Sequence, residues 1–254
     1  MQTGAITGYI DVAQIALYTF WLFFAGLIFY LRTEDKREGY PLITEREGHF
    51  LQGFPVAPSP KTFLLPNGTT VFAPRIDPPQ PTFDAQPVAG FPGAPMHPIG
   101  NPMLSGAGPS ASALRADTPD QMQEVPGNRV VPLRVATDHF LDDESPDPRG
   151  KEAIGADGVV GGIVSDLWID RAETVIRYLE VTLAAGPSVL VPMPLANVDA
   201  TGTVFVVSVL GSQFADAPNI ASPDQVTLRE EDRIQAYFAS GHLYAEASRV
   251  EPWL

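Results

Sequence analysis

The clearest pattern along the chain is one unbroken apolar run at residues 12–31, which contains no charged side chain. Eleven of its twenty residues are Val, Ile, Leu or Phe. At about 1.5 Å per residue, a helix of twenty residues spans roughly 30 Å, the thickness of the bilayer hydrocarbon. A signal peptide would need basic residues before the run, and a core helix would need a polar face, and neither is present. The pattern predicts a transmembrane helix.

Charges on the two sides of this helix predict its orientation. Arg32, Lys36 and Arg37 follow it, whereas Asp11 is the one charge before it. Because basic residues stay in the cytoplasm, we expect residues 1–11 to be periplasmic and the rest to be cytoplasmic. Asp11 is also a suitable N-cap for the helix.

Residues 32–54 are expected to continue the helix for one or two turns into water and then leave it. The charges alternate at helical spacing, so that Glu34 and Glu38 can meet basic neighbours three or four residues away. Gly39 is a plausible C-terminal stop, and Tyr40-Pro41 favours an extended exit.

Residues 55–126 hold sixteen of the twenty-six prolines and show no helical or alternating period. One hairpin is predicted, with strands 62–65 and 69–72 around a tight primed turn at Asn67-Gly68. The turn is also favoured over glycosylation of this Asn-Gly-Thr sequence, since the segment is expected to be cytoplasmic. The remainder is either a disordered linker or an extended arm on a partner surface. Apolar anchors favour the arm: Phe83, Phe91, Met96, Met103 and Leu104.

Residues 127–220 change to short β-rich runs separated by turn signals. Leu179, Val181 and Leu183 alternate with more polar positions, as in a half-buried strand. Five or six such strands predict a small antiparallel barrel or sandwich, with a bulge or corner at Gly161-Gly162. The runs are VVPLRVA, GVVGGIVSDLWID, TVIRYLEVTLA, SVLVPMP and TVFVVSVL.

Residues 221–254 are predicted to form a C-terminal helix and tail. Thr227 and Glu230 have the spacing of a capping box, in which each side chain satisfies a free backbone donor. An apolar face follows, and Gly241 is the expected stop. The residues of that face are Ile234, Tyr237 and Phe238.

Composition limits the possible functions. The formal charge is −14, and from residue 55 onward 12 Lys or Arg stand against 24 Asp or Glu, a net of −12. Such a body repels nucleic acid and anionic lipid, so its partner should be protein. The chain has no Cys, which excludes disulfides, thiolate metal sites and a cysteine nucleophile.

Enzyme signatures are not evident in the sequence. The four histidines have no metal-ligand spacing, and neither a nucleophile elbow nor a phosphate-binding loop is found. The acidic stretch 142–147 lacks the pattern of a calcium loop and is expected to be solvated. Carboxylates on the barrel remain as candidates, either as ordinary surface acids or as proton carriers whose pKa is raised by partial burial. These are Glu124, Asp166, Asp170, Glu173 and Glu180.

Eight blocks in order resemble the H subunit of the purple bacterial photosynthetic reaction centre. Three lie before residue 110: FWLFFAGLIFYLRTEDKREGYPL, PKTFLLPNG and NPMLSGAGP. Five follow: VPLRVA, DPRG, VSDLWIDRAE, RYLEV and SPDQVTLREEDRIQAYFASGHLYA. The resemblance implies a single-pass inner-membrane protein with a PRC-barrel on the cytoplasmic side.

The resemblance also implies a role without catalysis. Such a subunit stabilises the L and M subunits and conducts protons to the secondary quinone, which takes up two electrons and two protons. It binds no cofactor principally itself, while the complex holds bacteriochlorophyll, bacteriopheophytin, quinones, carotenoid and non-haem iron. Further partners would be a light-harvesting antenna, a cytochrome subunit and membrane lipids.

Site residues carried over from the family are three carboxylates. Glu173, at the end of the D-x-x-E segment, matches the carboxylate nearest the quinone and is expected to relay protons. Asp170 is its expected partner, and Glu124 matches an acid near the proton entry. Family histidines beyond that acid are replaced here by Pro126 and Asn128, so carboxylates and water would serve instead.

Two other classes of function are weaker alternatives. Small barrels of this type also occur in membrane-tethered modules that only dock partners, without a photochemical role. An anchored enzyme would need a pocket with a nucleophile or metal, for which the sequence offers no residue set.

Overall fold

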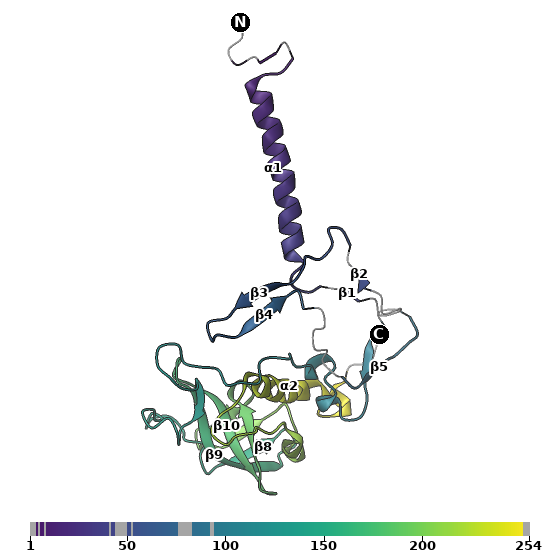
Figure 1. The fold of residues 1–254 in the computed structure, drawn as a ribbon. Helices are drawn as coiled ribbons and strands as arrows, with labels where there is room; N and C mark the ends of the chain where they lie inside the picture. Colours follow the sequence, from purple (N-terminus) through teal and green to yellow (C-terminus); the bar gives the residue numbers. More distant parts are fainter. Residues whose placement is uncertain are drawn as a thin grey trace. The chain divides into compact units, whose positions relative to one another are not determined.

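The computed structural model describes residues 4, 6–7, 9–40, 42–43, 50–51, 53–75, 83–91 and 94–250 (Figure 1). It divides into two compact units, Met1–Pro79 and Gln80–Leu254. The Pro-rich stretch 55–126 therefore spans both units. Its predicted use as an arm, and the other predicted domain limits, stay predictions.

The first unit contains the long apolar helix α1, Val12–Asp35, whose described side chains are all at least partly exposed. It is long and apolar enough to cross a membrane, in agreement with the predicted span. Asp11 is the N-cap as predicted: its Oδ1 accepts a 2.7 Å hydrogen bond from the backbone N–H of Gln14. The helix continues one turn past residue 31, also as predicted.

Ion pairs and a guanidinium hold the C-terminal end of α1 to the segment that follows it within the same unit. Glu34 pairs with Arg37 at 2.7 Å and with Lys61 at 2.9 Å. Arg37 also donates to the backbone oxygens of Ser59 and Ala73, at 2.8 and 3.0 Å. The last turn of α1 is thereby fixed to both strands of the hairpin described next.

The predicted hairpin is present as β3, Lys61–Leu64, and β4, Thr70–Ala73, but its turn is not the primed type. A primed turn needs positive φ at both central residues, whereas only Gly68, at φ +82°, has it here. Beyond the strands, Leu65 N–H donates to Thr69 O at 2.8 Å, which leaves a three-residue loop, 66–68, closed by Gly68 N–H on Leu65 O at 2.9 Å. Pro66 explains the difference, because its ring holds φ negative.

A second short pair of strands in the first unit is formed by β1, Leu42–Ile43, and β2, Phe50–Leu51.

The second unit is built on a seven-stranded, curled half-barrel sheet (Figure 1). The strand order is β11-β10-β9-β8-β13-β12, and β7 also pairs with β9. All pairs are antiparallel except β13 with β8, which is parallel and was not predicted. The strands are β7 Val130–Pro132, β8 Glu152–Gly155, β9 Val160–Asp170, β10 Val175–Leu183, β11 Ser188–Pro192, β12 Asn197–Val198 and β13 Val204–Val206.

The bulge predicted at Gly161-Gly162 is confirmed. Ala153 pairs with Gly162 and Ile154 with Val160, so Gly161 is the extra residue of β9. A Cβ on Gly161 would lie 2.5 Å from the Phe214 ring, because this ring occupies the space that a side chain at position 161 would need. Phe214 belongs to the 3₁₀ segment η4, Gly211–Asp216.

Helix α2, Leu228–Tyr244, covers this sheet and carries the predicted capping box of Thr227 and Glu230. Its predicted apolar face is confirmed, with Ile234, Tyr237 and Phe238 each at most 1% exposed. The predicted stop at Gly241 is wrong, because the helix runs one turn further. Gly241 is a packing position instead: a Cβ there would lie 2.3 Å from Ser208 O.

Part of the Pro-rich stretch belongs to the second unit. Two short strands pair, β5 Ala85–Pro87 and β6 Met96–Pro98. Two 3₁₀ turns, η1 Pro102–Leu104 and η2 Gly108–Ser110, pack on α2. Met103 is only 2% exposed and joins the core, so this anchor is satisfied within the chain. Two further 3₁₀ turns are η3 Met193–Leu195 and η5 Ala247–Arg249.

Replacing Gly241 with Ala should destabilise the protein although Ala favours helix formation. The gain of about 1 kcal/mol in helix propensity should be outweighed by an overpacking cost of about 1–3 kcal/mol against the Ser208 carbonyl. Thermal unfolding of the purified full chain in detergent measures the difference.

Ala239 provides the matched control on the exposed side of the same helix. There the reverse change, Ala239→Gly, should destabilise by about 1 kcal/mol from propensity alone. A higher midpoint for Gly241→Ala than for the unmodified chain would contradict the packing role of Gly241.

Candidate functional site

The candidate site lies at the turn between β9 and β10. Asp170 ends β9, and its Oδ1 accepts hydrogen bonds from the backbone N–H groups of Ala172 and Glu173, at 3.0 and 3.2 Å. Thr174 closes the turn at φ 55°, in the left-handed region, and its N–H donates to Asp170 O at 2.7 Å. The aspartate thus shapes the turn that carries Glu173.

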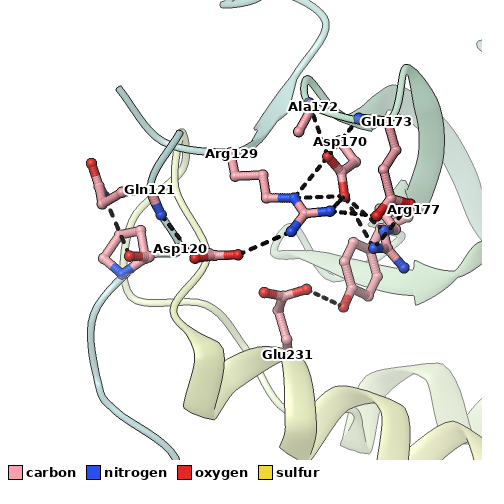
Figure 2. A network of polar contacts seen from close by, with 10 residues as sticks. Asp120, Gln121, Arg129, Asp170, Ala172, Glu173, Arg177 and Glu231 are labelled. Carbon is pink, nitrogen blue, oxygen red and sulfur yellow. Dashed lines mark hydrogen bonds and ion pairs between the residues drawn. The ribbon is translucent and has the colours of Figure 1, made fainter. Parts of the chain in front are cut away.

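Two arginines from different segments bind the carboxylate of Asp170 (Figure 2). The Nε of Arg129, in the residue before β7, lies 2.9 Å from Oδ1, and its Nη2 lies 2.9 Å from Oδ2. Arg177 on β10 places its Nη2 3.0 Å from Oδ2. Asp170 itself is inaccessible to solvent, so its charge is compensated inside the protein.

Glu173 lies beside the same arginines but on the solvent side. Its Oε1 is 2.5 Å from Arg129 Nη2, and its Oε2 is 3.6 Å from Arg177 Nη2. Its side chain is 54% exposed, whereas that of Asp170 is fully buried. The two predicted carboxylates are therefore brought together, in different surroundings.

These surroundings hold the pKa of Asp170 below its ordinary value. Burial alone would raise that pKa, but the hydrogen bonds from Arg129 and Arg177 and the backbone N–H of Glu173 outweigh burial. In this chain Asp170 is therefore not one of the carboxylates whose pKa burial raises. Its proposed partnership with Glu173 must rest on a fixed negative charge.

Glu124 lies in the loop that precedes Arg129 and is exposed. The loop is closed by a backbone bridge between Gln121 and Asn128 and by the Gln121 amide, which donates to Asn128 Oδ1 at 2.8 Å. Its base is joined to the site by Asp120, whose Oδ2 lies 3.5 Å from Arg129 Nη1.

An open cavity of about 530 Å³ connects this loop to the β9–β10 turn. Both Glu124 and Glu173 line it, together with Asp120, Arg129 and Arg171. Asp170 lies behind it, bound to Arg129. A cavity of this size with polar walls can hold several waters that bridge polar groups which do not touch.

The other two carboxylates of interest belong to a different cluster, gathered by Arg134. Its Nη1 lies 3.0 Å from Asp166 and 2.7 Å from Glu180, and its Nε lies 3.0 Å from Asp224. Glu180 also accepts a 2.8 Å bond from the Trp168 indole. Asp166 and Glu180 are therefore structural ion-pair partners rather than ordinary surface acids.

Sequence reasoning missed the cations of the site and one further carboxyl. Arg129 and Arg177 lie 41 and 7 residues from Asp170, and only the i,i+4 spacing of Glu173 and Arg177 gave a local signal. Glu231 on α2 accepts a 2.8 Å hydrogen bond from the Tyr178 hydroxyl. No local pattern distinguished it from the neighbouring capping residue Glu230.

Within the described ranges, no three His, Asp or Glu side chains are grouped closely enough to hold a metal ion. The site is thus a set of carboxylates and arginines around water-accessible space. Residues of these types can exchange protons and stabilise charge.

An apolar N-terminal helix joined to a half-barrel with an acidic network defines a membrane-anchored PRC-barrel protein. Residues 142–214 match the model of the PRC-barrel domain. Residues 4–135 match that of the photosynthetic reaction centre, H-chain N-terminal region. The chain belongs to the photosynthetic reaction centre H-chain family, which confirms the resemblance found in the sequence.

Membership of this family identifies the complex, the membrane and the partners of the chain. The chain is a reaction-centre H subunit and a single-pass inner-membrane protein, and its partners are the L and M subunits. The pigments and quinones belong to the complex that these subunits form.

Replacing Asp170 with Asn should destabilise the protein by about 1–3 kcal/mol at neutral pH, because Arg129 and Arg177 lose their shared buried anion. The Asp170 pKa is lower in the folded protein than the ordinary 3.8. Its stabilising contribution is therefore complete above that value and is lost as pH falls through the folded pKa. Thermal unfolding at neutral and acidic pH measures both effects.

The matched control is Asp143→Asn, in the exposed stretch 142–147. It should leave the unfolding midpoint nearly unchanged at every pH. Equal midpoints for Asp170→Asn and the unmodified chain at neutral pH would exclude the anchoring role.

Proposed function

We propose that this H subunit conducts protons from the cytoplasm towards the secondary quinone of the reaction centre. Glu173 is the group that takes up and releases the proton, and Glu124 lies at the entry. Asp170 is a positioning residue that keeps its charge. The quinone supplies the redox chemistry and consumes the protons, and this chain supplies the route.

The observation that carries the proposal is the single cavity lined by both Glu124 and Glu173. One carboxylate lies on the exposed loop and the other on the ion-paired turn, so water between them can connect bulk solvent to the arginine cluster. No histidine lines this cavity. The loop positions 126 and 128 are Pro and Asn, which leaves carboxylates and water as carriers.

The geometry supports different tasks for the two carboxylates of the turn. Asp170 is held by donors from four residues and is not accessible to water, which favours a permanent anion. Glu173 is half exposed and has no backbone donor among its described hydrogen bonds. Its side chain can leave Arg129 without breaking the turn, as a proton carrier must.

We also propose that residues 55–126 act as an arm that packs on the L and M subunits. Four of the five predicted anchors remain exposed on the chain itself, at 40–58%. Only Met103 is buried in the chain's own core. Apolar side chains with this degree of solvent exposure are typical of protein interfaces. The four are Phe83, Phe91, Met96 and Leu104.

For the orientation, we propose a periplasmic N-terminus and a cytoplasmic barrel. The support is the charge pattern: Arg32, Lys36 and Arg37 lie at the C-terminal end of α1, and Asp11 lies at the other end.

Replacing Glu173 with Gln should slow the proton-coupled reduction of the secondary quinone by about tenfold or more, since general acid–base groups contribute about 10²–10⁴-fold where they act directly. Electron transfer that precedes proton uptake should keep its rate. Flash spectroscopy of the purified complex, with a pH-indicator dye, measures both steps.

Glu144→Gln is the matched control, because Glu144 is an exposed glutamate of the solvated stretch 142–147. It should leave both steps unchanged. Unchanged proton-coupled kinetics in Glu173→Gln, with the complex intact, would remove the assignment of Glu173.

Single cysteines should report the orientation, because the chain has no Cys of its own. A membrane-impermeant maleimide should label Ile6→Cys from the periplasmic side and Asp143→Cys from the cytoplasmic side. Ile6 is 56% exposed, so the first label is sterically possible. The opposite pattern in spheroplasts and inverted vesicles would reverse the proposed orientation.

A further inference from the structure

A second carboxyl lies on the α2 side of the same network, at Glu231 (Figure 2). It is partly buried, and its Oε2 accepts a 2.8 Å hydrogen bond from the Tyr178 hydroxyl. The Tyr178 oxygen in turn accepts a 3.0 Å bond from the amide of Gln235. Glu231 is the residue after the capping residue Glu230, so helix capping does not explain its hydrogen bond with Tyr178.

Glu231 and Asp170 have opposite environments although they share one network. Asp170 has two arginines and two backbone N–H groups. Among the described residues, Glu231 has no ion pair closer than 4 Å, and its one hydrogen-bond donor is the neutral Tyr178. A carboxyl in partial burial without a paired cation loses much of the stabilisation of its charged form. Paired titratable groups with such divergent environments are the usual sign of divided acid–base tasks.

Three charged groups act on Glu231, besides its burial and its hydrogen bond from Tyr178. Burial is the largest influence and raises its pKa. The Tyr178 hydrogen bond and the more distant Arg115 and Arg177 oppose this rise, whereas Asp120 adds to it. The net direction is upward, the reverse of Asp170.

The same neighbours couple Glu231 to the proposed route. Asp120 lines the cavity and pairs with Arg129, and Arg177 pairs with both Asp170 and Glu173. When Glu173 takes up a proton, less negative charge remains beside Arg177. Arg177 then stabilises the charged form of Glu231 more strongly. Through Arg177, the charge of Glu231 is therefore expected to respond to the charge of Glu173.

We propose that Glu231 is a further proton-exchanging residue of this subunit, which stores a proton beside the cavity and exchanges it as Glu173 changes charge. Tyr178 is its positioning residue. This inference rests on the proposed proton conduction and adds a group on α2 that the sequence blocks did not single out for this role.

Isotope-edited infrared difference spectroscopy of the whole complex, with ¹³C-labelled glutamate, tests the proposal. A carboxylic C=O band that changes on quinone reduction should be lost in Glu231→Gln, with a loss of part of the flash-induced proton uptake. Tyr178→Phe removes the O–H donor and keeps the ring. It should raise the apparent pKa of the band, because that donor favours the charged form.

Glu152→Gln, an exposed glutamate of β8, is the control and should leave the band and the uptake intact. An unchanged band and unchanged uptake in Glu231→Gln, while Glu173→Gln is slow, would overturn the role of Glu231 alone. If Glu173→Gln is also without effect, the proposed proton conduction itself fails. If the complex with Glu231→Gln does not assemble, Tyr178→Phe decides: an unchanged apparent pKa of the band would overturn the inference.

Discussion

The candidate site depends on one buried charge, the carboxylate of Asp170. Without compensation, a carboxylate inaccessible to solvent would cost several kcal/mol and would take up a proton instead. Arg129 and Arg177 prevent this from two sides, and the turn's own N–H groups complete the set. The same contacts hold together the start of β7, the end of β9 and β10, which is why the position of Glu173 is defined.

The proposed proton route assigns different tasks to a fixed anion and to exchangeable acids. Asp170 keeps the two guanidinium groups in place at all pH values near neutrality, so that the field around Glu173 stays constant. Protonation can then change at carboxyl groups with weaker partners, where a small change in the charge of a neighbour shifts the proton occupancy. Arginine suits this frame because it remains charged and offers several donors in a fixed plane.

Local patterns predicted most of the fold, and non-local contacts explain the misses. The apolar run, the capping box at Thr227 and the glycine bulge in β9 each act within a few residues, and each was predicted. Strand β8 is short and reads Glu-Ala-Ile-Gly, so only its pairing with β9 and β13 defines it. Gly241 looked like a helix end because its real constraint, Ser208 O, lies 33 residues away in sequence.

The site shows the same limit in electrostatic terms. Resemblance to the family identified Asp170 and Glu173, but a carboxylate's pKa depends on donors that the fold brings to it. Desolvation pushes the pKa of both Asp170 and Glu231 upward, but hydrogen bonds from two arginines and a backbone N–H outweigh it at Asp170 and not at Glu231. Those partners come from segments up to 41 and 53 residues away. The type of residue therefore shows where a proton can be held, and the packing of distant segments decides which carboxyl holds it.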